Sequence, residues 1–260
     1  MAADGYLVAC VDLAGQGDSG RREVYSMEDN AAEVLAVAGA VSVCGASKPV
    51  LIGHSFGGWV VMACARQADA ASKLGGIICL DSPVRPPDAQ GGGPPPQVKK
   101  KKGAESAEAM LLRFKLMPEQ PVTSQFIMDY VGPLSLTTVP DEDDASKELW
   151  VWKDDAERML KTRFSPGGPA GMALFLRGIN TRMALVYGAK SFFFSDTNTL
   201  PYMRKELEEQ RPGGEYTPII AIEDAYHHLM FDQPIAMVAA LRGILGEWTR
   251  ADEAKKRSKL

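Results

Sequence analysis

The chain has 260 residues, a net charge of −4, 45% apolar residues and 24% charged residues. This length is enough for one large α/β domain with a substantial core, and the acidic balance gives no general case for nucleic-acid binding. Four cysteines without CxxC spacing and only three histidines argue against a disulfide framework and a zinc site. No apolar run is long enough to span a membrane. We therefore expect no metal, no cofactor, no nucleic-acid partner and no membrane span, which leaves a small-molecule substrate as the expected partner.

Residues 6–11 form a continuous apolar run, which is typical of a buried parallel strand. Residues 26–43 have apolar positions at helical spacing, and Ser26 is placed to cap that helix.

The next stretch carries the clearest motif. An apolar strand at 50–53 runs into Gly53-x-Ser55-x-Gly57, and an apolar helix follows over 57–68. A serine exposed at a sharp strand-to-helix turn takes a strained backbone, and its neighbours two residues away must be small. The helix N-terminus beside it favours developing negative charge. We interpret Ser55 as a nucleophile on such a turn.

Strands alternate with helices through the rest of the chain, which predicts a mostly parallel sheet covered on both faces. The expected strands are 76–80, 183–188 and 218–222, and the expected helices are 199–210 and 235–248.

Composition changes between these strands. Residues 88–103 are rich in Gly, Pro and Lys and read as a solvated connector. Helical patterns follow at 104–117, 121–131 and 153–164, with an acidic loop at 141–144. We predict a helical cap over 84–180, inserted between core segments 1–83 and 181–250, and a tail over 251–260. Trp150 and Trp152 of the predicted cap, and the aromatic run 192–194 after it, either line a pocket or form a small core of their own.

A serine nucleophile needs a base, and histidine is the natural one at neutral pH. His54 precedes Ser55 on the turn, so its ring should point away from the hydroxyl and play a supporting role. His227 and His228 follow the last strand, at the sheet edge where ligands collect in α/β folds. The residues alone leave both open as the base.

Three segments resemble the α/β-hydrolase superfamily: the D-x-x-G-x-G-x-S turn that begins at Asp12, the turn around Ser55, and the segment from Tyr226 to Pro234. The superfamily often reads G-H-H-L-x-L-x-Q-P in the last of these, with the first histidine catalytic. The resemblance therefore implies an α/β-hydrolase fold with an inserted cap, and His227 as the base.

The resemblance also bears on the acid. Many members carry it in a G-x-x-D turn, but here that turn is 188–191 and ends in Ser191. One subgroup of haloalkane dehalogenases, and a serine hydrolase-like family, carry an acid where this chain has Asp81, which is followed by Arg85-Pro86. We predict Asp81 as the acid, with Asp196 as the alternative.

An oxyanion hole in this superfamily uses the N–H after the nucleophile, here that of Phe56, and a second N–H from a His-Gly loop that this sequence lacks. The superfamily strand that adjoins the nucleophile strand is also missing. We therefore expect a sheet without its N-terminal strands. Either the natural start lies upstream of Met1, or residues 6–11 pair directly with 50–53.

These features predict a serine hydrolase that cleaves a small or acyl ester or thioester. A serine in place of an aspartate nucleophile argues against dehalogenase and epoxide hydrolase chemistry. The alternatives are a haloperoxidase or C–C hydrolase on the same triad, and a non-catalytic binding protein. The last residues, Ser258-Lys259-Leu260, match the signal read by the peroxisomal import receptor, which predicts a peroxisomal location.

Overall fold

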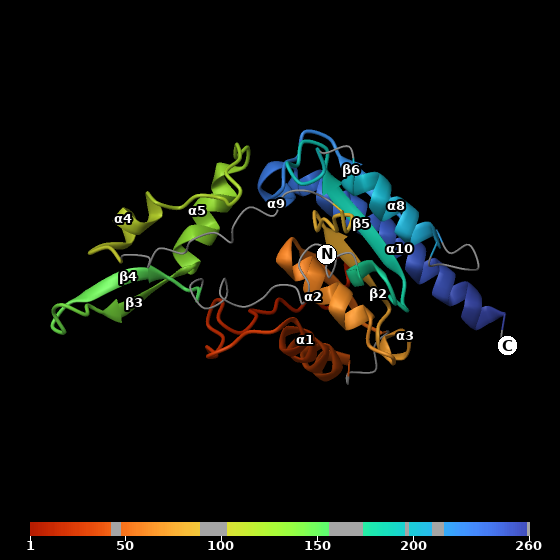
Figure 1. The fold of residues 1–260 in the computed structure, drawn as a ribbon, viewed down its shortest axis with the longest axis horizontal. Helices are drawn as coiled ribbons and strands as arrows, with labels where there is room; N and C mark the ends of the chain where they lie inside the picture. Colours follow the sequence, from red (N-terminus) through yellow and green to blue (C-terminus); the bar gives the residue numbers. More distant parts are fainter. Residues whose placement is uncertain (43–47, 89–102, 156–173, 196–197, 210–215, 259–260) are drawn as a thin grey trace.

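The computed structural model describes residues 1–42, 48–88, 103–155, 174–195, 198–209 and 216–258. Figure 1 shows two parts: a layered body that holds the parallel sheet, and a smaller lobe to one side of it.

The body is organised around four parallel strands in the order β1-β2-β5-β6. They are β1 (Val50–His54), β2 (Gly76–Leu80), β5 (Met183–Gly188) and β6 (Ile219–Ile222). Every residue of β2 is buried, as expected of a strand covered on both faces. The predicted fold class, a mostly parallel sheet between helices, is confirmed, and so are the strands at 76–80, 183–188 and 218–222.

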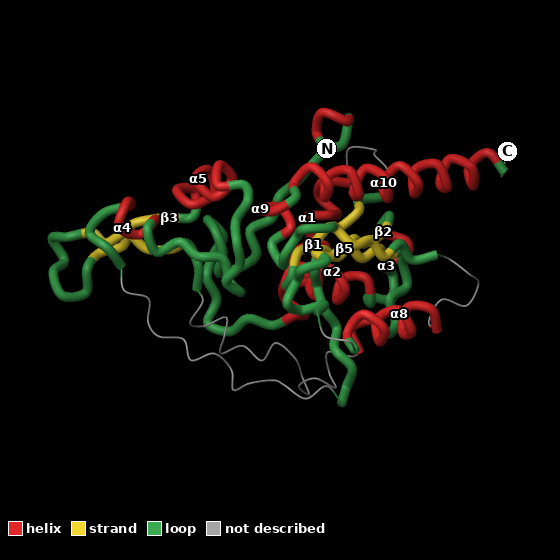
Figure 2. The backbone as a smooth tube through the Cα atoms, turned by 90° about the horizontal axis from the view of Figure 1, so that it is seen from above, coloured by secondary structure: helices red, strands yellow, loops and turns green. Residues whose placement is uncertain are grey.

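Side chains of β2 and β5 alternate between two cores, because successive residues of a strand point to opposite faces. Ile77 and Cys79 pack on the face covered by α1 (Met27–Ser42), α2 (Phe56–Ala65) and α8 (Thr199–Glu209). Ile78 and Leu80 pack on the other face against α10 (Pro234–Arg257). Figure 2 shows the sheet edge-on, with α10 on one side and α2 and α8 on the other.

The helices largely follow the predictions. Ser26 caps α1 as expected, because the Asp29 N–H donates to its hydroxyl at 3.0 Å. The last helix is longer than predicted and continues to Arg257. The shorter elements are η1 (Ala2–Asp4), α3 (Ala70–Lys73), η2 (Leu174–Leu176) and α9 (Leu229–Asp232).

The predicted strand at 6–11 is wrong, because these residues adopt no regular structure. Leu7 and Val8 are 71% and 52% exposed. An apolar run becomes a strand only where a neighbour completes its hydrogen bonds, and within the described residues β1 lies at the edge of the sheet. The predicted pairing of 6–11 with 50–53 is therefore not formed, and Ile52 of β1 is 42% exposed.

The smaller lobe consists of residues 103–155, which we call the cap segment. It contains α4 (Ala107–Leu111), α5 (Gln125–Leu134) and an antiparallel hairpin of β3 (Leu136–Pro140) and β4 (Glu148–Trp152). The predicted helical cap is therefore helical only in part over these residues, because the segment also contains a hairpin. Most residues of the hairpin strands are half-buried, and the acidic loop at 141–144 is part of the connection between them.

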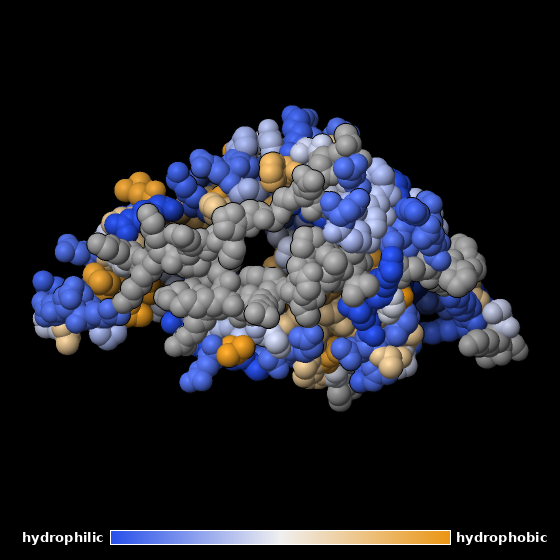
Figure 3. All heavy atoms as spheres, viewed as in Figure 1, coloured by the Kyte–Doolittle hydropathy of each residue, from blue (hydrophilic) through white to orange (hydrophobic). Residues whose placement is uncertain are grey.

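The cap segment has its own small core of Ala104, Met110 and Leu136, against which Trp150 and Trp152 pack. The connector prediction for 88–103 and the helix prediction for 153–164 fall mostly on residues outside the described ranges. On the face in Figure 3, apolar side chains of the described residues are scattered among hydrophilic ones. None of the described helices combines the length and apolar character that a membrane crossing requires.

Candidate active site

Ser55 lies between the last residue of β1 and the first residue of α2. Its backbone has φ 51° and ψ −115°, a conformation that L-residues rarely adopt. The turn is held by the Ser55 N–H, which donates to the Leu80 carbonyl at 2.9 Å. A Cβ on Gly53 would collide with the backbone of Gly57. The glycine is therefore required so that the strand and the helix can pass closely.

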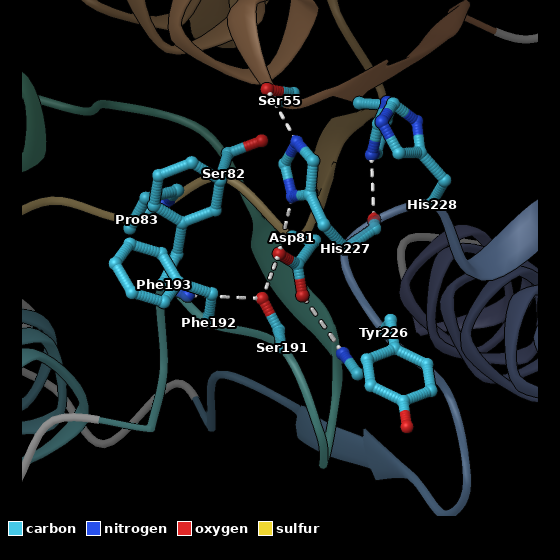
Figure 4. Close-up of polar contacts among 12 residues, drawn as sticks. Ser55, Asp81, Ser82, Pro83, Ser191, Phe192, Phe193, Tyr226, His227 and His228 are labelled. Carbon is cyan, nitrogen blue, oxygen red and sulfur yellow. Dashed lines mark hydrogen bonds and ion pairs between the residues drawn. The ribbon is translucent and has the colours of Figure 1, made fainter. Parts of the chain in front are cut away.

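His227 connects Ser55 to Asp81 (Figure 4). Its Nε2 lies 2.9 Å from Ser55 Oγ, and its Nδ1 lies 2.7 Å from Asp81 Oδ2. The carboxylate accepts from Nδ1–H, which leaves Nε2 able to accept the serine proton. The His227 side chain is 3% exposed and that of Asp81 is fully buried. The three residues predicted as a triad thus form one hydrogen-bonded chain.

Asp81 follows the last residue of β2, and its carboxylate is held by two further donors. The Gly188 N–H donates to Oδ1 at 2.9 Å, and the buried Ser191 hydroxyl donates to Oδ2 at 2.6 Å. Ser191 stands in the turn where many superfamily members carry the acid, and here its hydroxyl donates to Asp81 instead. Sequence reasoning noticed this substitution but gave Ser191 no role, because nothing in the sequence places its hydroxyl beside Asp81.

The other two histidines surround His227 without reaching Ser55. The His54 Nε2 donates to the His227 carbonyl at 2.8 Å, and the two ring centroids are 4.7 Å apart. Burial, reinforced by the nearby His227, lowers the pKa of His54 from 6.5 to about 3. The His228 Nε2 donates to the Met117 carbonyl at 3.0 Å, and burial lowers the pKa of this ring too. Both are therefore neutral hydrogen-bond donors at neutral pH.

A cavity of about 330 Å³ opens in front of Ser55. It combines the turn around Ser55, the loop of His227, the segment that begins at Val11, and Met117 of the cap segment. The lining residues are Val11, Asp12, Leu13, Gln16, His54, Ser55, Phe56, Gly57, Met117, His227 and His228. Phe56 is the first residue of α2, so its N–H lies at the positive end of the helix.

Several predicted residues lie elsewhere. Trp150 and Trp152 pack in the cap segment's own core and do not line the cavity. Phe193 packs edge-on against the His227 ring, with centroids 4.6 Å apart, and so supports that ring. Asp196, the alternative acid, falls outside the described residues. Among the residues that are described, no group of three or more His, Cys, Asp or Glu side chains is arranged to hold a metal ion.

A parallel sheet with a strained serine between a strand and a helix, and a histidine after the last strand, defines an α/β-hydrolase architecture. The chain belongs to the alpha/beta hydrolase family, whose model matches residues 1–241. Comparison with curated proteins gives no significant match.

Three solved structures of similar fold are 15–20% identical to this chain. An esterase of Mycobacterium tuberculosis is 20% identical, with a TM-score of 0.61 over 90% of this chain and 74% of its own. A thioesterase domain from the curacin biosynthetic pathway is 20% identical, with a TM-score of 0.53 over 88% and 78%. A peroxisomal alpha-beta-hydrolase of Saccharomyces cerevisiae is 15% identical, with a TM-score of 0.61 over 92% and 66%. At these identities the likeness concerns the fold alone.

Proposed function

We propose that this chain is a serine hydrolase that cleaves small or acyl esters or thioesters through an acyl-enzyme. The observation that carries the proposal is the unbroken chain of hydrogen bonds from Ser55 through His227 to Asp81, with a cavity in front of the serine. The esterase and thioesterase among the proteins of similar fold support the same class of bond.

The proposal gives each residue a step. Ser55 Oγ attacks the substrate carbonyl while His227 Nε2 takes its proton, and Asp81 stabilises the resulting imidazolium. The Phe56 N–H, at the start of α2 and in a residue that lines the cavity, is assigned to stabilise the oxyanion. His227 then gives the proton to the leaving alcohol or thiol, and the same residues activate water to release the acid. A cavity of about 330 Å³ suits a short acyl group.

A fluorophosphonate probe and a chromogenic p-nitrophenyl ester test the proposal. The wild-type protein should be labelled and should hydrolyse the ester, and Ser55→Ala should lose labelling and about 10⁴-fold or more of kcat. Ser72→Ala, which changes an exposed serine of α3, is the matched control and should behave as wild type. A folded protein that is neither labelled nor active would instead support a non-catalytic binding protein.

A second pair of variants tests whether Asp81 or Asp196 is the acid of the proposed triad. Asp81→Asn keeps the shape of the side chain but presents the wrong hydrogen-bond pattern to His227 Nδ1, so kcat should fall about 10³- to 10⁴-fold. Asp196→Asn should leave kcat near the wild-type value. The reverse pattern would move the acid to Asp196.

We also propose import into peroxisomes through Ser258, Lys259 and Leu260, read by the import receptor. Support comes from the sequence match, from the exposed Ser258 after the last residue of α10, and from the peroxisomal protein of similar fold. A fluorescent protein fused to the N-terminus of the full chain should accumulate in peroxisomes. Deletion of the last three residues should abolish this, and unchanged targeting would contradict the proposal.

A further inference from the structure

The two residues that flank His227 have their backbone N–H groups held by a pair of side chains. The Tyr226 N–H donates to Asp232 Oδ2 at 2.8 Å, and the His228 N–H donates to Gln120 Oε1 at 2.9 Å. The Gln120 Nε2 donates to the same Asp232 oxygen at 2.9 Å. A continuous path of hydrogen bonds therefore runs from one side of His227 to the other.

Gln120 comes from the cap segment, whereas Asp232 ends α9 in the body. Further bonds join the same two stretches of chain. The Thr123 hydroxyl donates to the Asp232 carbonyl at 2.6 Å, and the Ser124 N–H donates to the Phe231 carbonyl at 2.9 Å. These bonds fix where Gln120 stands relative to the loop that carries the base.

The same part of the cap segment also reaches the cavity. Met117 lines it, and its carbonyl accepts from the His228 ring. A substrate in the cavity would therefore touch Met117, which lies three residues before Gln120, and Gln120 is bonded to the N–H of the residue that follows His227.

We propose that Gln120 is a positioning residue that, together with Asp232, fixes the backbone on both sides of His227 and couples the placement of the cap segment to that of the base. The inference rests on the proposed function, because it assigns a role relative to His227 as the base. His227 must hold its two ring nitrogens against Ser55 and Asp81 at once, and an error of about 1 Å in such a group can cost about 100-fold in rate.

The amide is the group that this place requires. A glutamine side chain offers one acceptor and one donor group, and here the acceptor meets the His228 N–H while the donor meets Asp232. A glutamate would keep the acceptor but set a second carboxylate against Asp232, which is 4% exposed. Two adjoining carboxylates repel each other unless they share a proton.

This difference gives Gln120→Glu a pH signature. As the pH falls, a proton taken up between the two carboxyl groups replaces the missing amide hydrogen. Burial raises the pKa of Asp232, which favours such uptake. The nearby His228 ring stays neutral because burial lowers its pKa.

The experiment uses the full chain with Gln120→Ala, Gln120→Glu and the control Glu119→Ala, whose side chain is 79% exposed. The readouts are kcat and KM for a p-nitrophenyl ester, the rate of fluorophosphonate labelling, and the melting temperature, between about pH 6 and about pH 8.5. We expect Gln120→Ala to lower kcat and the labelling rate about 10- to 100-fold with KM little changed. Glu119→Ala should match wild type, and the activity of Gln120→Glu relative to wild type should rise about fivefold or more toward low pH.

Each outcome has a distinct meaning. If wild type shows Ser55-dependent hydrolysis and both Gln120 variants match it, the inference is wrong and the proposed function stands. A Gln120→Glu activity ratio that stays constant with pH, or a loss confined to the melting temperature, also overturns it. If wild type is not labelled at Ser55, the proposed function fails and the inference falls with it.

Discussion

Replacing His54 with glutamine tests whether the fold keeps a histidine uncharged beside the base. A glutamine Nε2 can still donate to the His227 carbonyl, which accepts from His54 at 2.8 Å, but it cannot take up a proton. His54→Gln therefore removes the titration while keeping the bond.

The expected effect follows from proton linkage. Burial lowers the pKa of His54 from 6.5 to about 3 in the folded protein. Between these two pH values His54 is therefore protonated in the unfolded chain but neutral in the folded protein. The stabilisation is therefore fully present above about pH 6.5 and is lost as the pH falls toward about 3, at about 1.4 kcal/mol per pH unit. Between about pH 6.5 and about pH 4.5 the loss due to His54 alone amounts to about 2–3 kcal/mol.

Urea unfolding of both proteins across this range measures the effect. We expect the stability advantage of wild type over His54→Gln to shrink by about 2–3 kcal/mol between about pH 6.5 and about pH 4.5. Every other titrating group is common to the two proteins and cancels in the difference. A difference that does not change with pH would refute the reasoning, because His54 would then be protonated as readily in the folded protein as in the unfolded chain.

The same property matters for the proposed chemistry. A charged His54 would stand with its ring centroid 4.7 Å from that of His227. With an effective dielectric constant of about 20, two unit charges at that separation repel each other by about 3–4 kcal/mol. A neutral His54 therefore leaves His227 free to become an imidazolium during the reaction.

Two further substitutions test the supports of the site. Ser191→Ala removes the buried 2.6 Å hydrogen bond to the Asp81 carboxylate, so the free energy of unfolding should fall by about 1.5–3 kcal/mol in urea titrations. The control Ser195→Ala, at an exposed serine, should change it little. Equal stabilities of the two variants would show that the bond to Asp81 contributes nothing. Gly53→Ala drives a Cβ into the backbone of Gly57, whereas a Cβ on Gly57 itself meets nothing within 4 Å. Gly53→Ala should therefore lose about 3 kcal/mol or more and Gly57→Ala far less, measured by thermal unfolding; similar losses would contradict the packing argument.

Much of the body could be predicted from sequence because its signals are local. Apolar runs such as 76–80 and 183–188 are short, buried on both faces and bounded by polar turns, and each became a strand. The run at 6–11 carries the same signal but has no strand partner among the described residues, and a sequence window does not record whether a partner exists. The hairpin of β3 and β4 could not be predicted in this way, because its short strands are mostly half-buried and show no alternation between buried and exposed residues.

The candidate site divides in the same way. Ser55 and the segment of His227 lie in compact motifs, so residue types at fixed spacing could indicate them. Ser191 and Gln120 could not be found in this way, because each acts through a bond to a residue more than 100 positions away in the chain. Only the fold brings those partners together.

The backbone conformation of the site lowers the stability of the fold at residues that the proposed activity requires. Ser55 and Asp81 both have positive φ, 51° and 45°, at the ends of neighbouring strands. Side chains other than glycine cost about 1–3 kcal/mol in such conformations. At Asp81 three hydrogen bonds to the carboxylate offset this cost, whereas glycine at position 55 would relieve it. Variants such as Ser55→Gly should therefore be more stable than wild type and inactive, and a screen of this protein for thermal stability alone would select against its own proposed nucleophile.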